Sequence, residues 1–237
     1  MPNKYFRFKQ FTVWHDRCAM KVGTDGVLLG AWSPVTSGSA NILDIGTGSG
    51  LITLMLAQRC PKANIDAIDI DHAAIEQARE NFSASPWSGR LHARCISLQS
   101  FAKETDKRYE LIVSNPPYFV DSLKNPDLRR QAARHTDTLD YSDLVYCASK
   151  LLSTSGTLAL ILPAEAREKI LCYASDSGLN VRQMTNVYSK PGKPVKRVLM
   201  SLSKGDAAKY TESDLYIESE DSPRSEAYNS LTEEFYL

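Results

Sequence analysis

Two short motifs in this chain combine residue types at spacings that suit ligand binding and catalysis. The first runs from Ile42 to Gly50: a hydrophobic stretch ends in Asp44, and glycines follow at alternate positions, Gly46, Gly48 and Gly50. Because glycine lacks a Cβ, such a turn lets a ligand approach the backbone closely and lets the chain pass tightly from a strand into a helix. The turn therefore predicts a ligand site, although glycine turns of this kind serve several ligands.

A second carboxylate, Asp69, narrows the choice of ligand. It closes the next predicted strand, and its distance from Gly46 is close to the roughly 20 residues expected in nucleoside-binding folds. A carboxylate there accepts hydrogen bonds from both ribose hydroxyls of an adenosine-containing ligand. Asp44 precedes the glycines, where it would repel a pyrophosphate but suits the charged amino-acid end of S-adenosylmethionine, directly or through water. The pattern favours S-adenosylmethionine over a nicotinamide or flavin dinucleotide.

The second motif, Asn115-Pro116-Pro117-Tyr118, follows a predicted strand and suits an acceptor nitrogen. Each proline fixes φ and removes a backbone donor, which leaves carbonyl acceptors in a rigid arrangement. An amine conjugated with a ring or amide is a poor nucleophile, because its lone pair is delocalised. If the Asn115 side-chain oxygen and the Pro116 carbonyl accept its two N–H groups, the lone pair turns toward the methyl donor. Tyr118 offers a flat face for stacking on a planar acceptor, such as a nucleobase swung out of its stack.

These motifs need a scaffold that holds them at one place, and the sequence predicts an alternation of strands and helices. Short apolar runs predict strands at 41–45, 65–69, 91–95, 110–114, 157–162, 181–188 and 197–203. Helical patterns fall between them, at 50–59, 71–82, 141–152 and 164–175. This alternation is typical of repeated βα units and a mostly parallel sheet. The polar stretch 119–138 lacks periodicity and predicts a long loop, a kind that is usually functional.

Composition indicates one compact unit. The chain has 237 residues, of which 43% are hydrophobic and 24% charged, as is usual for a single globular domain. No window approaches the roughly 18 apolar residues that a membrane span needs, and the first residues lack the apolar core of a signal peptide. The five cysteines are widely spaced, without the spacing of a metal site. We therefore expect a cytoplasmic protein with reduced thiols and no metal.

The formal net charge is zero, which argues against binding nucleic acid by bulk charge alone. The charges are unevenly distributed, however, because six basic residues and no acidic one lie between positions 181 and 205, and the first 23 residues are also basic. Local contact with a polyanion is one interpretation, and ordinary solvated surface is the other. The residues expected to contact phosphates are Lys193, Lys196, Arg197 and, beside the acceptor motif, Arg129, Arg130 and Arg134.

The order of the glycine turn, Asp69 and Asn115-Pro116-Pro117-Tyr118 resembles that of the class I S-adenosylmethionine methyltransferases. This resemblance implies a Rossmann-like α/β fold with a seven-stranded, mostly parallel sheet that has an antiparallel last hairpin strand. Blocks at 18–32, 131–136 and 225–237 are similar to the bacterial enzymes that methylate the N6 amine of the adenosine beside the anticodon of tRNA(Val). The resemblance implies tRNA and S-adenosylmethionine as partners. It also implies a single domain, 1–237, with a core at 41–204 between extensions at 1–40 and 205–237.

Carried over residue by residue, the resemblance implies roles for individual positions. Asn115 to Tyr118 hold the base, and the Lys21 to Asp25 segment of the N-terminal extension closes over the methionine end of the cofactor. One position departs from the pattern: many relatives carry an acid after the third strand that contacts the cofactor's adenine, whereas this chain has Ser97. The cofactor-binding residues implied in this way are Lys21, Thr24, Asp44, Gly46, Gly48, Gly50, Asp69, Ile70, Ser97 and Asn115.

Three other functions fit parts of the pattern. A guanine amine of ribosomal RNA suits the acceptor motif as well as an adenine amine does, and no residue excludes it. A glutamine carboxamide poses the same lone-pair problem, but the glutamine methyltransferases carry a helical domain before the glycine turn, and here only about 40 residues precede it. A non-catalytic RNA-binding protein with this fold would not need the intact acceptor motif.

Overall fold

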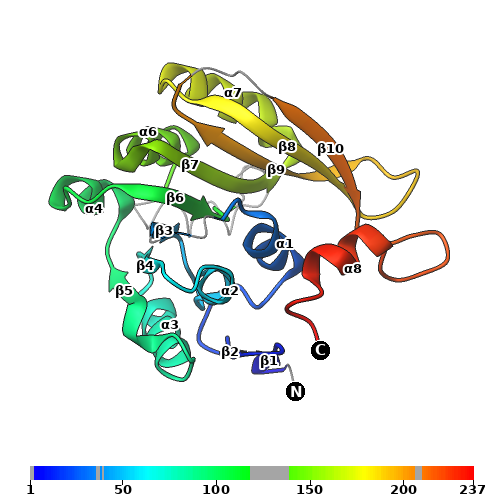
Figure 1. Ribbon diagram of the computed structural model, residues 1–237, viewed down its shortest axis with the longest axis horizontal. Coiled ribbons are helices and arrows are strands. Elements are labelled where there is room, and N and C mark those ends of the chain that lie inside the picture. The colour runs from blue at the N-terminus through cyan, green and yellow to red at the C-terminus, as the bar shows by residue number, and fades with distance from the viewer. Residues whose placement is uncertain (1–2, 36–37, 39, 118–138, 206–209) are drawn as a thin grey trace, which may run out of the picture.

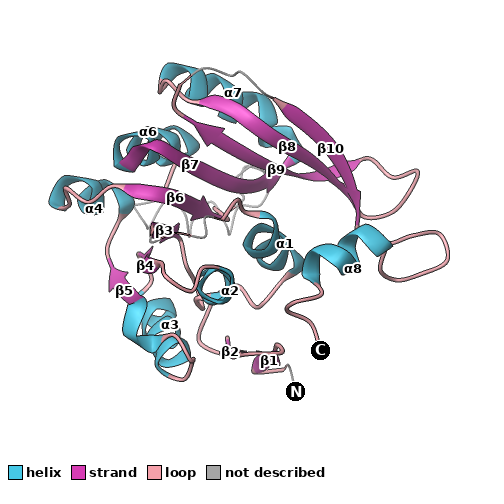
Figure 2. Ribbon diagram, in the orientation of Figure 1, coloured by secondary structure: helices cyan, strands magenta, loops and turns pink. Residues whose placement is uncertain are grey.

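The computed structural model describes residues 3–35, 38, 40–117, 139–205 and 210–237. Within these residues the main sheet has eight strands in the order β10-β8-β9-β7-β6-β3-β4-β5 (Figures 1 and 2). The strands are β3 (Asn41–Ile45), β4 (Asn64–Asp69), β5 (Leu91–Cys95), β6 (Tyr109–Ser114), β7 (Leu152–Pro163), β8 (Asn180–Tyr188), β9 (Val195–Ser203) and β10 (Thr211–Tyr216). Neighbouring strands are parallel, except that β9 runs antiparallel to both β7 and β8.

Helices cover both faces of this sheet (Figure 1). On one face lie α1 (Thr24–Trp32), α2 (Leu51–Arg59), α3 (His72–Ser83) and α8 (Glu226–Thr232), which share a core with that side of the sheet. On the other face lie α4 (Leu98–Glu104), α6 (Tyr141–Leu151) and α7 (Arg167–Asp176), which form a second core. Because side chains alternate along a strand, neighbouring residues such as Ile42 and Leu43 enter opposite cores. The central strands are therefore apolar on both faces, as their continuous hydrophobic runs predict.

The predicted α/β class is confirmed, and most expected elements lie within a few residues of their predicted bounds. The strands β3 and β5 have the bounds that the sequence predicts, and α6 ends one residue early. The expected helix at 164–175 is divided into a short 3₁₀ turn at Ala164–Ala166 and α7. The predicted loop at 119–138 lies outside the described residues, together with Tyr118.

The sheet differs from the seven strands expected by one additional strand, β10. It comes from the C-terminal extension and pairs in parallel with β8 over six residues, from Thr211 opposite Gln183 to Tyr216 opposite Tyr188. Only Leu215 of this edge strand is buried. An acid-rich edge strand with one buried side chain lacks the apolar alternation by which strands are recognised in a sequence.

The two chain extensions pack against each other. The N-terminal extension contains a hairpin of β1 (Tyr5–Arg7) and β2 (Thr12–Trp14), which lies near the C-terminus (Figure 1). Just after β1, the Lys9 backbone N–H donates to the Phe235 carbonyl at 2.8 Å, and the Phe8 ring stacks on Tyr236. The first helix, α1, begins at the edge of the sheet where β3 and β6 end, and it runs back toward the edge where β3 begins.

Candidate active site

A cavity of about 370 Å³ opens where the parallel strands β3 and β6 end, and the end of β4, with Asp69, lies beside β3 without lining it. The sheet runs outward in both directions from β3, through β4 on one side and β6 on the other, and ligands bind at such switch points in open α/β sheets. Besides Asn115, the cavity has three sides. They are the N-terminal segment 20–26, the glycine-turn wall (residues 46–49, 51 and 52) and the β9 wall (Val187, Lys196, Arg197 and Ile217).

The glycine turn is shaped by the main chain. Gly46, Gly48 and Gly50 have φ angles of 72°, 55° and 82°, a left-handed region that side chains with a Cβ rarely adopt. The N–H groups of Gly46 and Thr47 donate to the Ile68 carbonyl at 2.9 and 3.0 Å, which joins the turn to β4. A Cβ at Gly50 would collide with the Phe82 ring, whereas a Cβ at Gly46 or Gly48 would meet nothing within 4 Å. The first two glycine positions, Gly46 and Gly48, therefore leave open space above the backbone.

Asp44 lies fully buried beneath this turn. The hydroxyls of Thr47 and Thr53 each donate to its Oδ2 at 2.7 Å, while its Oδ1 has no hydrogen-bond partner among the described residues. Burial raises the pKa of this carboxyl from its ordinary value of 3.8 to about 6. A buried carboxylate oxygen without a partner is costly unless a ligand or water binds it. Asp44 lies beneath the cavity lining and not in it, and the ammonium group of S-adenosylmethionine, or a water that this group binds, would satisfy the oxygen.

Asp69 is placed differently, because it is partly exposed at the end of β4. Its Oδ2 accepts the Gly48 N–H at 2.9 Å, and its Oδ1 accepts the Asp71 N–H at 3.0 Å. Each carboxylate oxygen retains a second lone pair, so both can still accept a hydroxyl hydrogen bond. The geometry therefore suits the paired hydroxyls of a ribose.

Two further predicted cofactor residues lie close to Asp69 in the fold. Ile70 follows it in the chain and is 50% exposed. Ser97 follows the neighbouring strand β5 and caps α4: its hydroxyl accepts from the Ser100 N–H and donates to the Ser100 hydroxyl. One lone pair of the Ser97 oxygen remains for an N–H donor such as an adenine amine. The roles predicted for Ile70 and Ser97 stay predictions.

The acceptor motif lies beside the glycine turn because β6 pairs with β3. The Ser114 hydroxyl donates to the Ile45 carbonyl at 2.8 Å, and Asn115 then lines the cavity. Pro116 is buried and Pro117 is exposed. The structure thus brings the Asn115-Pro116-Pro117 stretch of the predicted acceptor motif to the same cavity edge as the cofactor turn.

The β9 wall was not predicted as part of this cavity. Lys196 and Arg197 were expected to contact RNA, and the structure places both in the cavity lining. The Arg197 Nε donates to Asp25 Oδ2 at 2.9 Å, and both side chains are mostly buried, at 22% and 27% exposure. This ion pair connects the β9 wall with the N-terminal segment, where Lys21 and Thr24 line the cavity as expected. No sequence signal identifies the pair, because its partners are 172 positions apart.

The remaining predicted phosphate contacts lie elsewhere. Lys193 is exposed in the turn between β8 and β9. Arg129, Arg130 and Arg134 lie outside the described residues. The phosphate-binding roles of all these basic residues, including Lys196 and Arg197, stay predictions.

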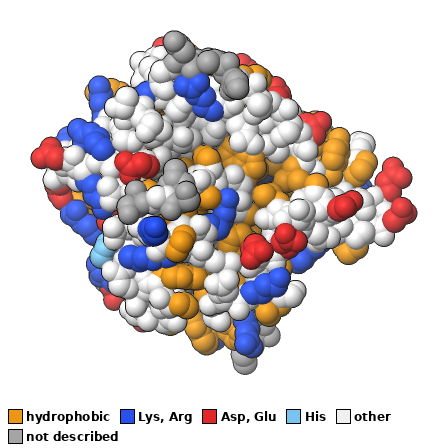
Figure 3. All heavy atoms as spheres, in the orientation of Figure 1, with side chains coloured by type: hydrophobic (Ala, Val, Ile, Leu, Met, Phe, Trp, Pro, Cys, Tyr) orange, Lys and Arg blue, Asp and Glu red, His pale blue; other side chains and the backbone are white. Residues whose placement is uncertain are grey.

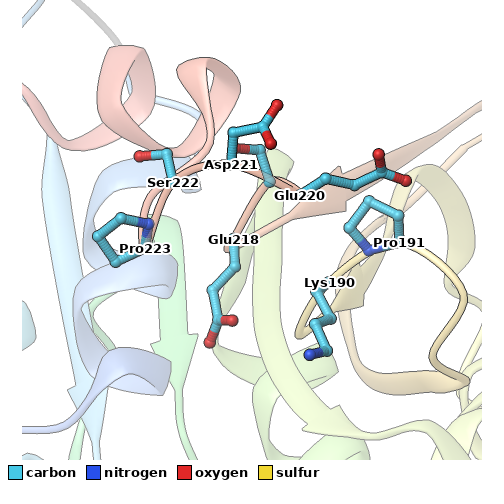
Figure 4. A pocket seen from close by; sticks show the side chains of 8 residues that line it. Lys190, Pro191, Glu218, Glu220, Asp221, Ser222 and Pro223 are labelled. Atoms are coloured by element: carbon cyan, nitrogen blue, oxygen red, sulfur yellow. The ribbon is translucent and has the colours of Figure 1, made fainter.

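A second hollow, of about 510 Å³, lies between the Lys190-Pro191 turn and the loop at 218–223. Figure 4 shows Lys190 and Glu218 extending to the same side, with the carboxylates of Glu220 and Asp221 pointing away from them. This hollow contains no residue of the glycine turn or the acceptor motif. The smaller cavity at the strand ends is therefore the candidate active site.

Metal-ligand clusters, disulfide bonds and membrane-spanning helices are absent from the described part of the chain. No group of three or more His, Cys, Asp or Glu side chains there is arranged to hold a metal ion. All five cysteines are free thiols, and Cys95 and Cys172 are exposed. No described helix has the length and hydrophobicity that crossing a membrane requires.

Comparisons with known proteins agree with this geometry. Residues 26–171 match the methyltransferase small domain family. A tRNA1(Val) (adenine(37)-N6)-methyltransferase of Phocaeicola vulgatus is 53% identical over 237 residues, which is 100% of this chain and 99% of the relative. An enzyme of the same name from Parabacteroides distasonis is 50% identical with the same coverage. Among solved structures, a predicted O-methyltransferase of Agrobacterium tumefaciens superposes with a TM-score of 0.71 at 20% identity, covering 89% of this chain and 96% of the other, which shows the shared fold.

Proposed function

The chain belongs to the methyltransferase small domain family, with full-length relatives named tRNA1(Val) (adenine(37)-N6)-methyltransferase, and from this premise we propose that it methylates the N6 amine of adenosine 37 in tRNA1(Val) with S-adenosylmethionine. One observation carries the chemistry: Asn115 lines the same cavity as the glycine turn. A methyl donor held by the turn and an amine held at Asn115 would therefore meet. The full-length identity of the relatives supports the choice of adenine over guanine or glutamine.

The residues present fit the proposed cofactor. Asp69 accepts the ribose hydroxyls, and the glycine turn leaves room for the ligand above the backbone. The unpartnered Oδ1 of Asp44 attracts the ammonium group, directly or through water. Lys21 and Thr24 line the side of the cavity that the N-terminal segment 20–26 forms, where their side chains suit the methionine carboxylate. When bound, S-adenosylmethionine supplies an electrophilic methyl group on a sulfonium sulfur.

The acceptor residues act by position and electrostatics. The Asn115 side-chain oxygen and the Pro116 carbonyl accept the two N–H groups of the adenine amine, so its lone pair faces the methyl group. Methyl transfer would break the bond from the methyl group to sulfur as the new N–C bond forms, so the positive charge would pass from sulfur to the nitrogen, where the two oxygen acceptors stabilise it. The methylated nitrogen then loses a proton to water, because a cationic amine conjugated with the ring is strongly acidic. No general base and no metal ion are needed.

Domain organisation and location complete the proposal. Residues 1–237 act as a single domain, since the extension at 1–40 supplies the segment 20–26 to the cavity and the extension at 205–237 supplies Ile217. Neither cofactor binding nor binding of the acceptor amine requires an obligate protein partner. Because the substrate is tRNA and the cysteines are unpaired, the protein works in the cytoplasm.

The direct test is methyl transfer with purified protein, S-adenosylmethionine and tRNA1(Val) transcripts. We expect N6-methyladenosine in the parent transcript and none in a transcript with guanosine at position 37. Ribosomal RNA and a release-factor protein serve as competing substrates. Methylation of either one in preference to tRNA would overturn the proposed acceptor, and binding of tRNA without any methyl transfer would overturn the proposed activity.

Lys193 in the turn between β8 and β9, and Lys196 in the cavity lining, are proposed to contact phosphates of the tRNA. Replacing Lys193 and Lys196 by alanine removes both residues. Because log K falls as log salt rises, each lost phosphate contact should make this slope shallower by roughly 0.7 to 0.9. The control is Lys150→Ala, which removes an exposed lysine of α6 on the opposite face of the sheet. An unchanged slope in the double variant would mean that the tRNA phosphates bind elsewhere.

A further inference from the structure

The N-terminal hairpin carries two exposed aromatic rings that the proposed active site does not use. Tyr5 on β1 and Trp14 on β2 are directly opposite each other, and their ring centroids are 4.9 Å apart with a tilt of 48°. The two residues are 43% and 44% exposed. Such a pair stabilises a two-stranded hairpin, but it also presents aromatic surface to solvent next to the N-terminal segment of the active site.

The hairpin is fixed to the glycine-turn wall through one buried side chain, Asn81 of α3. Asn81 Oδ1 accepts the Trp14 N–H at 3.0 Å, and its Nδ2 donates to the carbonyls of Trp14 and Ser49 at 2.8 Å each. Only 1% of Asn81 is exposed. Because Ser49 belongs to the glycine turn, the backbone of Trp14 is held in a set position relative to the proposed cofactor site.

A second connection joins the hairpin to the N-terminal segment of the cavity. His15, the residue after Trp14, is 5% exposed. Its Nδ1 accepts the Val22 N–H at 3.3 Å, and its Nε2 lies 2.9 Å from the Asn3 carbonyl. The hairpin is therefore connected both to the glycine-turn wall and to the N-terminal segment of the cavity, and a rigid support of this kind is what a binding site requires.

The charges around the pair favour a polyanion. Arg7 and Lys9 lie in the hairpin and Lys4 directly precedes it, while the nearest acidic residue in the chain, Asp16, follows two positions after Trp14. Lys4 and Arg7 are exposed, and the Lys9 side chain donates to the Glu233 carbonyl. Hydrophobic and basic side chains lie next to each other at the lower edge of the molecule in Figure 3, where Figure 1 places β1 and β2. Exposed aromatic rings among positive charges are the combination that binds unpaired nucleotides.

We propose that Tyr5 and Trp14 form a stacking platform for unpaired bases of the RNA substrate that neighbour the target adenosine. The inference rests on the proposed function, because it takes the anticodon loop of tRNA as the occupant. A loop whose target base is extruded needs its remaining bases held, and stacking on aromatic rings does this without reading their sequence. The fixed connection to Ser49 and Val22 gives the platform a constant distance from the cofactor.

The test replaces both rings by threonine, a β-branched residue that keeps the strand propensity of the hairpin. We expect Tyr5→Thr with Trp14→Thr to weaken binding of an RNA stem-loop that contains the anticodon loop by about 5- to 100-fold, from the loss of base stacking. Affinity for S-adenosylmethionine and the melting temperature should stay close to those of the parent. The matched control is Tyr146→Ala, which removes a 56% exposed ring from α6 on the opposite face and should leave RNA binding unchanged.

Further measurements separate stacking from a structural role. Trp14→Phe retains a ring and should keep RNA affinity within about threefold, and quenching of Trp14 fluorescence by the stem-loop should disappear in Trp14→Thr. If the double variant loses stability and cofactor affinity along with RNA binding, and Trp14→Phe behaves likewise, the pair is structural and the proposal fails. Self-association of the parent that the double variant lacks would also overturn it, because the occupant would then be a second copy of the chain.

The failure of this inference and of the proposed function are distinguishable. If the parent methylates tRNA1(Val) and the double variant has the same KM for tRNA and the same stem-loop affinity, only the platform is wrong. If the parent transfers no methyl group to tRNA, the proposed function is wrong, whatever the hairpin binds.

Discussion

The glycine-turn wall and the β9 wall face the same cavity but are built in different ways. In the glycine-turn wall, backbone groups and side chains of adjacent strand ends bind one another, as in the hydrogen bond from the Gly48 N–H to Asp69. In the β9 wall, side chains from separate strands meet, and its ion pair from Arg197 to Asp25 joins distant parts of the chain. A change in the first wall should therefore remove cofactor binding itself, whereas a change in the second should adjust how the cavity is closed.

Asn115 lies between the two walls, and its replacement should have the largest effect. We expect Asn115→Ala to lower turnover by about 100-fold or more, because one oxygen acceptor for the reacting amine is lost. Affinity for S-adenosylmethionine should remain within a few-fold, since Asn115 is proposed to act on the acceptor and not on the methyl donor. Single-turnover kinetics and calorimetry measure the two quantities. Turnover within threefold of the parent would remove Asn115 from the reaction.

The pH dependence of stability tests the role of Asp44 beneath the glycine-turn wall. Burial raises the pKa of Asp44 to about 6, so the folded protein binds its proton more tightly than the unfolded chain does. Protonation therefore stabilises the fold fully below about pH 4, and this stabilisation is lost as the pH rises through 6. The contribution is on the order of 3 kcal/mol for a shift of about two pKa units. We expect Asp44→Asn to remove this part of the pH dependence in thermal unfolding of the cofactor-free protein between pH 4 and 7.

The pH dependence of cofactor affinity should have the opposite sign to the pH dependence of stability. An ionised Asp44 attracts the ammonium group of S-adenosylmethionine, so the affinity of the parent should increase as the pH rises through about 6. Asp44→Asn should bind more weakly at pH 7 and lack this increase. Parallel stability curves for parent and variant across the pH range would show that Asp44 does not titrate in the fold as proposed.

Asp69 tests the same wall at its exposed end. We expect Asp69→Ala to weaken S-adenosylmethionine binding by about 1–3 kcal/mol, because two ribose hydroxyls lose a charged acceptor. The control is Asp71→Ser, which removes a neighbouring carboxylate but keeps an oxygen to cap α3. Calorimetry should separate the two variants, and equal losses would show a general charge effect in place of a specific contact.

The Asp25–Arg197 pair tests the β9 wall, and the smallest effect is expected there. In a cycle of Asp25→Ala, Arg197→Ala and the double variant, S-adenosylmethionine affinity should show a coupling of about 1 kcal/mol, because either single change releases the N-terminal segment from β9. If Arg197 also binds a tRNA phosphate, Arg197→Ala but not Asp25→Ala should make the fall of log K with log salt shallower for tRNA binding. Strictly additive cofactor affinities would show that the pair does not position the segment.

The local elements and both motifs were determined by the sequence. The strand β3 and the helix α3 depend on residues a few positions apart, so apolar runs and helical periodicity identify them. The meeting of Asp69, the glycine turn and Asn115 was also predictable, because each follows a parallel strand and the carboxyl ends of such strands share one edge. The cofactor class and the acceptor chemistry follow from these residues.

Only the tertiary structure decided which distant residues complete the site. The chain has 28 basic and 28 acidic residues, and nothing in their order indicates that Arg197 pairs with Asp25. Likewise, the sequence shows no reason for Asn81 to hold Trp14 against the glycine turn, or for β10 to extend the sheet. The burial that raises the pKa of Asp44 also depends on how α2 and β3 pack. These features depend on contacts between segments far apart in the chain, and local periodicity carries no information about such contacts.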